Sequence, residues 1–188
     1  MDFRFFIYVL FLITALVSCK QEILVVNKDH VDLKLANGVL LYKNRPFEGL
    51  LVDTYDDTSL KMELQYWDGR KHGYEKRWYP EGQLAQSRLY AHGLKIGNHQ
   101  GWWEDGSKKF QYHFNDHGQY HGGRKEWYRN GQLFLEFHYV HGKESGKQKM
   151  WTERGEIRAN YEVRHGERFG LIGLKKCYTV NLDSHVLQ

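Results

Sequence analysis

Four histidines recur at almost equal spacing, and they are the residues of this 188-residue chain that most suggest metal chemistry. Each stands directly before a glycine; they are His92, His117, His141 and His165. If the chain between them forms successive hairpins, neighbouring histidines lie about 10 Å apart, which is two strand spacings. The ligands of one zinc ion lie only about 2 Å from the metal, so adjacent units cannot share an ion. Histidine also tolerates the left-handed turn conformation, and we expect turn residues here, with no metal and no cofactor.

A column of tryptophans is the clearest aromatic feature of the chain. Its members occupy the same place in successive units and are Trp78, Trp102, Trp127 and Trp151. Residues at one place on successive hairpins project from the same face of a sheet. We expect this column to pack as a ladder along the sheet. A row of stacking platforms for a glycan or a protein partner is the alternative.

A second aromatic column falls one residue later, so it points to the opposite face. Its members are Tyr79, Trp103 and Tyr128. A single-layer sheet cannot bury both of its faces against itself, and an exposed aromatic patch often marks an interaction site. This column is therefore the candidate partner-binding surface, with packing against the sheet as the open alternative.

No arrangement of a nucleophile, a base and an orienting group can be argued from the sequence. The carboxylates are scattered, and no fixed spacing pairs them. An array duplicates its residues, whereas a catalytic site needs a unique constellation in a pocket. None of the glycines has the strand–loop–helix context of a phosphate-binding loop. We therefore expect a protein that is not an enzyme.

Glycines must position these columns, because they recur in the same register. Pairs separated by three residues step along the chain by 24, 25, 24 and 24 residues; they are Gly69/Gly73, Gly93/Gly97, Gly118/Gly122, Gly142/Gly146 and Gly166/Gly170. The single step of 25 comes from one extra residue between Gly106 and His117. Such a fixed period is the signature of an array of small structural units.

A further column of glycines marks the turn inside each unit. Its members are Gly82, Gly106, Gly131 and Gly155. We expect them at hairpin turns that require a positive φ, which glycine adopts without steric cost. Asn130-Gly131, flanked by alternating apolar residues, is among the strongest short-range hairpin signals.

The spacing predicts an all-β fold, in which about five hairpins of 24 residues stack into one elongated antiparallel sheet over residues 38–170. The first unit is degenerate, because Thr54 stands in the tryptophan column and Thr58 in the turn-glycine column. Terminal units of arrays are commonly atypical. Residues 171–188 are expected to cap the array as a closing edge strand.

Composition supports many short strands and excludes two other classes. Aromatic residues make up 15% of the chain, with 19 glycines and only 2 prolines, which does not suit a disordered protein. The formal net charge is +4, but acidic and basic residues are interspersed along the units. A nucleic-acid-binding surface would cluster its Lys and Arg on one face, so we expect no nucleic-acid partner.

The N-terminus looks like a targeting segment, with Arg4 before an apolar run from Phe5 to Val17 that is short for a membrane span. The run ends Leu16-Val17-Ser18-Cys19, which resembles a bacterial lipobox. That resemblance implies a lipoprotein signal peptide over residues 1–18, acylation of Cys19 and a membrane anchor; an ordinary secretory signal is the alternative. Residues 19–37 would form a lipidated tether and the first strand. The absence of Asp after Cys19 favours the outer membrane.

The units themselves resemble MORN-type repeats, in the bacterial variant of the YwqK-type antitoxin family. Tyr90-Ala91-His92-Gly93-Leu94-Lys95-Ile96-Gly97, leading to Trp102 and Gly106, carries this resemblance. The chain departs from the pattern in having His where Asn is usual before the first glycine. The resemblance implies an elongated, twisted sheet of stacked hairpins. It also implies an antitoxin- or immunity-like role for some relatives and membrane association for others.

Together these features predict a non-catalytic binding lipoprotein of the bacterial cell envelope. Its partner would be a protein, held by shape and by the exposed aromatic column, as in an antitoxin-like, immunity-like or scaffold role. A lipoprotein of the envelope cannot neutralise a toxin in the cytoplasm, so a toxin partner would have to pass through the periplasm or the cell surface. Binding of a glycan through the same column and a purely structural role are the alternatives.

Overall fold

The computed structural model describes residues 22–173, which form two β-sheets and contain no helix. Accordingly, this part of the chain has no helix that is long and apolar enough to cross a membrane. The predicted signal peptide, Cys19 and all but three residues of the predicted capping segment lie outside the described residues.

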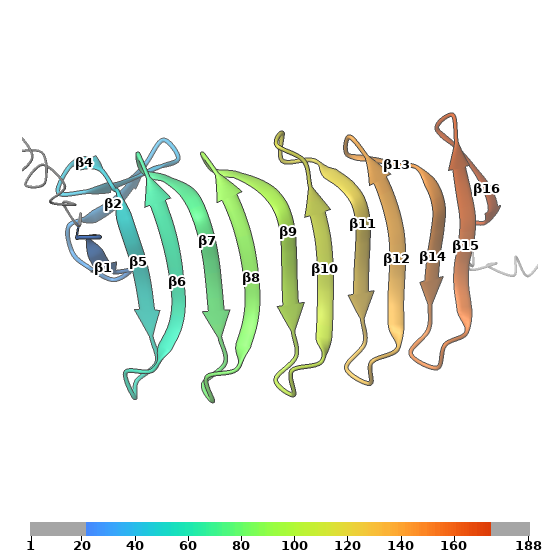
Figure 1. Cartoon of the computed structure of the whole chain (residues 1–188), viewed down its shortest axis with the longest axis horizontal. Coiled ribbons are helices and arrows are strands. Elements are labelled where there is room, and N and C mark those ends of the chain that lie inside the picture. The colour runs from blue at the N-terminus through green and yellow to red at the C-terminus, as the bar shows by residue number, and fades with distance from the viewer. Residues whose placement is uncertain (1–21, 174–188) are drawn as a thin grey trace, which may run out of the picture.

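The larger sheet has 13 strands, which lie side by side almost entirely in chain order (Figure 1). Only β1 runs parallel to its neighbour, β5; the other pairs are antiparallel. β13 and β14 are two pieces of one strand, and both pair with β12. The strands are β1 (Val25–Asn27), β5 (Gly49–Thr54), β6 (Leu60–Trp67), β7 (Arg70–Trp78), β8 (Leu84–Ala91), β9 (Leu94–Trp102), β10 (Lys108–Phe114), β11 (Tyr120–Trp127), β12 (Leu133–Val140), β13 (Lys143–Glu144), β14 (Gly146–Trp151), β15 (Ile157–Arg164) and β16 (Glu167–Leu171). The predicted all-β array of stacked antiparallel hairpins is confirmed.

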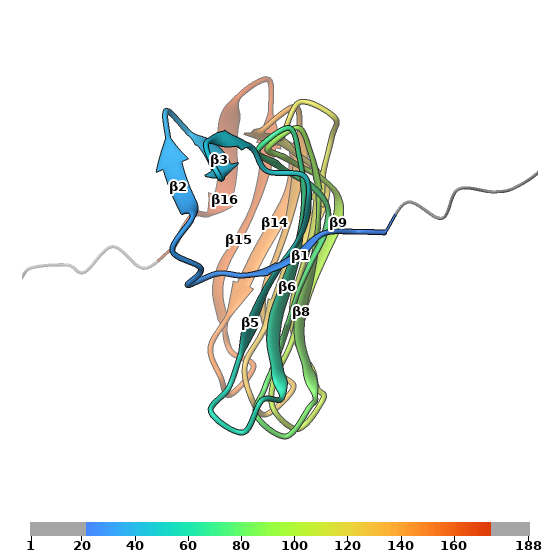
Figure 2. The ribbon, with the colours of Figure 1, turned by 90° about the vertical axis from the view of Figure 1, so that its left-hand side faces the viewer.

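The smaller sheet has three strands, β2 (Leu33–Ala36), β3 (Val39–Tyr42) and β4 (Arg45–Pro46). Viewed along its length, the large sheet is bent, and β2 and β3 lie on its concave side (Figure 2). Residues 38–46, where the sequence places the start of the array, belong to this small sheet. The first hairpin of the large sheet is formed by β5 and β6.

The hairpin turns at the lower edge of the sheet in Figure 1 share one geometry. In the β7–β8 turn, the Tyr79 N–H donates to the carbonyl of Gln83 at 2.9 Å, and the Gly82 N–H donates to the carbonyl of Tyr79 at 2.9 Å. This is a three-residue loop with a left-handed residue in its third position. The positive φ predicted for this position is observed; the values are 83° at Gly82, 81° at Gly106, 82° at Gly131 and 84° at Gly155.

The turns at the upper edge are mostly two-residue turns of a histidine and a glycine. His92, His141 and His165 have φ values of 48°, 47° and 53°, as expected for turn histidines. His117 departs from this expectation, because its turn runs from Asn115 to Gln119 with the hydrogen-bond pattern of the lower turns. The extra residue of the 25-residue step thus changes a two-residue turn into a three-residue turn and leaves both strands in register.

The two faces of the large sheet carry different side chains. The concave face holds buried apolar residues along its whole length, including Leu64, Tyr90, Leu135 and Tyr161. Alternate residues on the same strands point to the convex face, where charged pairs cross between strands, as in Lys76–Glu63 at 3.3 Å. Strand alternation therefore gives a half-apolar, half-polar sheet.

The largest apolar core lies where the small sheet covers the concave face. Its buried members are Val26, Phe47, Leu51, Met62 and Leu64. Side chains from β3 and β6, among them Leu40 and Tyr66, pack against it. Here alone the fold has two layers within residues 22–173; further along the sheet, aromatic side chains cover the concave face.

Replacing Thr58 with glycine is expected to stabilise the fold by about 1 kcal/mol. Thr58 takes the turn-glycine position of the first unit with a φ of 69°, an unfavourable conformation for a β-branched residue. The matched control is Gly82→Thr, since a Cβ at Gly82 meets nothing within 4 Å and only backbone strain changes. Urea unfolding should show shifts of opposite sign in the two variants; a destabilised Thr58→Gly variant would contradict the strain argument.

Candidate binding surface

A row of tyrosines links each unit to the next near the lower edge of the sheet. The Tyr55, Tyr79 and Tyr128 hydroxyls donate to the carbonyls of Trp78 at 2.9 Å, Trp102 at 3.0 Å and Trp151 at 3.2 Å, respectively. Each bond joins residues 23 positions apart. Two of the three residues predicted to bind a partner, Tyr79 and Tyr128, are thus half-buried and have a structural hydrogen bond between units.

Trp103 interrupts this row of tyrosines. Its indole takes the place of a phenol, and its Nε1 is buried without a hydrogen-bond partner among residues 22–173. Two cations lie over the ring, with Lys109 Nζ 4.2 Å and the Arg129 guanidinium 5.1 Å from its centroid. Arg129 also donates to Glu104 Oε2 at 3.0 Å. Trp103 is therefore the one member of the column that makes no bond to the next unit.

A shallow cavity of about 360 Å³ adjoins Trp103 at the lower end of the concave face. Its aromatic floor contains Phe110 and Tyr112, which stack with ring centroids 4.7 Å apart. Residues from three successive hairpins line it: Trp103, Lys109, Phe110, Tyr112, Glu126, Trp127, Tyr128, Arg129, Phe134 and Glu153. The fold thus brings together two of the predicted partner-binding residues, Trp103 and Tyr128, while Tyr79 does not line this cavity. We call it the Trp103 cavity.

Charges on the floor of the Trp103 cavity are held in fixed places. Glu126 Oε1 accepts hydrogen bonds from the Tyr112 hydroxyl at 2.9 Å and from Arg124 Nη2 at 2.7 Å. Burial, together with the Glu126 carboxylate, raises the pKa of the Tyr112 hydroxyl far above its ordinary value. Tyr112 is therefore a neutral hydrogen-bond donor to the Glu126 carboxylate.

The tryptophan column lies near the same edge. Alternation along the strands directs it toward the opposite face of the sheet, although Trp127 also lines the Trp103 cavity. All four of its members are half-buried. Trp78, Trp127 and Trp151 pair across strands with Leu84, Leu133 and Ile157, which suits the packing ladder expected from the sequence. Trp102 pairs with Lys108, whose Nζ lies 5.6 Å from the centroid of Trp127.

Histidine side chains meet in pairs near the upper edge. The ring centroids of His72 and His92 are 4.8 Å apart, and those of His121 and His141 are 5.0 Å apart. Each pair joins a strand residue to the following two-residue turn. Within residues 22–173 no group of three or more His, Cys, Asp or Glu side chains could hold a metal ion.

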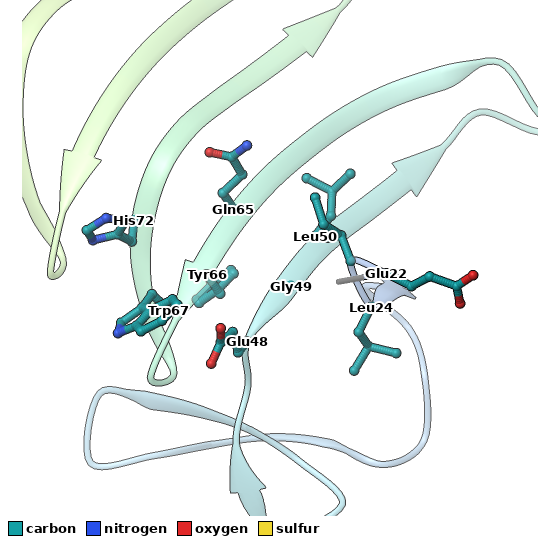
Figure 3. A pocket seen from close by; sticks show the side chains of 10 residues that line it. Glu22, Leu24, Glu48, Gly49, Leu50, Gln65, Tyr66, Trp67 and His72 are labelled. Carbon is teal, nitrogen blue, oxygen red and sulfur yellow. The ribbon is translucent and has the colours of Figure 1, made fainter. Parts of the chain in front are cut away.

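A second hollow, of about 470 Å³, lies at the N-terminal end of the sheet beside β1, β5 and β6 (Figure 3). Apolar side chains on its walls include Ile23, Leu24, Leu50 and Trp67. None of the site residues predicted from the sequence lies here. Trp67 stands outside the repeating tryptophan column, so the periodicity of the sequence does not single it out.

Glu75 is a buried carboxylate on the concave face, 2% exposed. Burial opposes its charge, but hydrogen bonds from Lys71 at 3.0 Å and Arg77 at 2.9 Å outweigh burial and hold its pKa below the ordinary 4.5. A lowered pKa stabilises the folded state above pH 4.5, and this stabilisation is lost as the pH falls through the folded value. Chemical denaturation at a series of acidic pH values should therefore show a smaller loss of stability below pH 4.5 in Glu75→Gln than in the unchanged protein; equal losses would contradict the ion pairing.

Comparisons with known proteins return no relative: no family model matches the chain, and no curated protein does. The fold and its surfaces define an open array of β-hairpins with shallow hollows, among them the Trp103 cavity and the N-terminal hollow. What such an array does has to be inferred from the residues that break its repetition.

Proposed function

We propose that the chain is a non-catalytic binding module of the bacterial cell envelope, anchored by lipid at Cys19, which binds a protein partner at the Trp103 cavity. The lipobox-like Leu16-Val17-Ser18-Cys19 supports the location. The resemblance to MORN-type repeats of the YwqK-type antitoxin family supports a partner-binding role of the antitoxin, immunity or scaffold kind. The observation that carries the site is the interruption of the tyrosine row at Trp103.

The composition of the Trp103 cavity favours a protein partner. Trp, Tyr and Arg are the residue types that most often dominate the energy of protein interfaces, and the cavity holds Trp103, Tyr128 and Arg129 together. Lys109 and Arg129 lie over the indole ring, so a sugar ring could stack there only after these cations moved. Glycan binding is therefore the less favoured alternative.

Trp103→Tyr is the variant that separates binding from folding. A tyrosine here matches the neighbouring units, where the hydroxyl donates to the tryptophan carbonyl of the next unit; the corresponding acceptor is the carbonyl of Trp127. We expect unfolding stability to be unchanged or higher by up to about 1 kcal/mol. Loss of a hot-spot tryptophan should weaken partner binding at least about 30-fold.

The test is a pull-down from envelope extract with residues 20–188, followed by mass spectrometry and affinity measurement on the captured protein. One stoichiometric protein should bind the unchanged chain and Gln111→Ala, a control on the convex face, and should be lost with Trp103→Tyr. Retention on cell-wall polysaccharide in place of a protein would support the glycan alternative. A partner that binds Trp103→Tyr at full strength would place the site elsewhere.

A further inference from the structure

Exposed apolar side chains gather at the N-terminal end of the fold. Half of the large apolar side chains that residues 22–173 expose lie there; they are Ile23, Leu24, Val25, Val31, Leu35, Trp67 and Tyr74. Single exposed apolar residues are ordinary on protein surfaces, but a cluster of them marks a place that contacts something apolar.

Part of this cluster lines one hollow. Ile23, Leu24 and Trp67 are 69%, 45% and 51% exposed, and together with Leu50 they line the N-terminal hollow (Figure 3). We call these four residues the N-terminal apolar patch. Trp67 has no role in the packing ladder, and the nearest ring to it is His72, with centroids 6.4 Å apart.

Backbone contacts tie the N-terminal apolar patch to the large sheet. The Leu50 N–H donates to the carbonyl of Leu24 at 2.8 Å, and β1 pairs with β5 from Val25 onward. Val26 is 4% exposed and belongs to the apolar core. A Cβ at Gly49 would lie 2.2 Å from the Leu24 carbonyl oxygen, so only glycine permits this close approach of the chain. The patch is thus presented as part of the folded sheet.

The position of Cys19 in the sequence indicates which surface the N-terminal apolar patch would contact. Only two residues, Lys20 and Gln21, separate Cys19 from Glu22, where the described structure begins. Even a fully extended chain places the α-carbon of Cys19 within about 10 Å of that of Glu22. Acyl chains on Cys19 would lie in a bilayer, so the start of β1 and the side chains around it must lie at the membrane surface.

The chemistry of the N-terminal apolar patch suits that surface. Tryptophan prefers the boundary between the headgroups and the hydrocarbon of a membrane, because its ring is apolar and its N–H can be hydrated. The exposed Glu22 and Glu48 also line the hollow and would be repelled by anionic lipids. Burial of apolar side chains, and not charge attraction, would therefore drive the contact.

We infer that the N-terminal apolar patch is a phospholipid-binding surface, which places Ile23, Leu24 and Trp67 in the membrane interface beside the anchor. The inference rests on the lipid anchor of the proposed function. It adds a second contact to the acyl chains and fixes which end of the sheet faces the bilayer. β9, which leads into Trp103, lies four strands beyond β5, which is about 20 Å along the sheet. The Trp103 cavity would thus remain in water.

The test uses the mature protein, acylated at Cys19, in phosphatidylcholine vesicles whose acyl chains carry bromine, a quencher of tryptophan fluorescence at short range. The chain has 6 tryptophans, and only Trp67 lies in the patch, so bromine should quench about one sixth of the emission. Trp67→Phe should abolish the quenching. Trp151→Phe, at the far end of the sheet, should retain it. Adding anionic lipid should not increase it.

The outcomes separate this inference from the proposed function. Acylation is read first, from the mass of the purified protein; an unacylated Cys19 would remove both the anchor and the membrane contact. Acylated protein without quenching, or with equal quenching in Trp67→Phe, would overturn the membrane contact and leave the anchor in place. Protection of Trp67 from aqueous acrylamide without vesicles would also overturn it, because a second copy or another protein would then cover the patch.

Discussion

Phe47→Ala is expected to lower the free energy of unfolding by about 3–5 kcal/mol, the usual cost of removing a fully buried phenylalanine. Phe47 is 1% exposed at the centre of the apolar core. Its ring contacts Tyr42 from the small sheet, with centroids 6.1 Å apart, and Tyr66 from β6, with centroids 5.7 Å apart. The ring lies between the two layers, so a cavity here would be filled only by moving the small sheet.

The same substitution should loosen the small sheet before it affects the rest of the array. Backbone bonds that fix this sheet run from the Gly69 N–H to the carbonyl of Phe47 and from the Leu40 N–H to the carbonyl of Gly69, both at 2.8 Å. Hydrogen exchange should therefore speed up at Leu40 and Gly69. The comparison is Leu135→Ala, a buried site of the fourth hairpin, which should also destabilise the protein but leave exchange at Leu40 unchanged. A loss below about 1 kcal/mol for Phe47→Ala would show that the small sheet contributes little to stability.

Periodicity explains why most of the large sheet could be predicted from the sequence. A glycine that must adopt a positive φ recurs wherever the turn recurs, so Gly82 and Gly131 show the turns directly. The histidines at 92 and 141 identify a second kind of turn for the same reason. Both signals are local, because the backbone conformation of a turn depends on the residues within it.

The small sheet could not be predicted, because its signals look like those of another unit. Asn37-Gly38 precedes an apolar strand, as a hairpin of the array would. The following turn uses Lys43 and Asn44, both left-handed with φ values of 50° and 62°, and contains no glycine to reveal it. The packing of Phe47 between the two layers and the backbone bonds through Gly69 hold this segment over the concave face, and such contacts between distant residues leave no periodic trace.

Much of the candidate site could not be predicted from the sequence either. Alternation along a strand correctly placed Tyr79 and Tyr128 in one column, but their hydrogen bonds join units 23 residues apart and cannot be read from one unit. Trp103 departs from the tyrosines of that column. The sequence does not show that this departure removes a hydrogen bond between units, because that bond is seen only in the structure. Trp67 has no counterpart in the other units, so periodicity gives no sign of it. A search for recurring residues finds the scaffold, whereas a unique site is formed by residues that do not recur.

Gly101→Ala is expected to cost about 2–3 kcal/mol and to close the Trp103 cavity. The Phe110 ring lies flat over Gly101, so a Cβ there would sit 2.1 Å from Phe110 Cε1 and 2.6 Å from both Cδ1 and Cζ. This ring also stacks on Tyr112 at 4.7 Å and lies 5.6 Å from the Arg88 guanidinium. A small rotation of the Phe110 ring cannot relieve this clash. The open space beside the ring is the Trp103 cavity, so the ring would have to move into it.

Gly123→Ala is the matched control for Gly101→Ala. Gly123 also lies within a strand of the large sheet, its φ is not positive, and an added Cβ meets nothing within 4 Å. This change should be neutral or stabilise the protein by up to about 1 kcal/mol, since alanine restricts the unfolded chain. If urea unfolding gives the two variants equal stability, the Phe110 ring adapts and the cavity survives. The other outcome is that Gly101→Ala is destabilised and loses the partner that Gly123→Ala retains. The aromatic floor is then the surface that the partner binds. The reason is that the two variants differ chiefly in whether the new methyl group displaces the Phe110 ring.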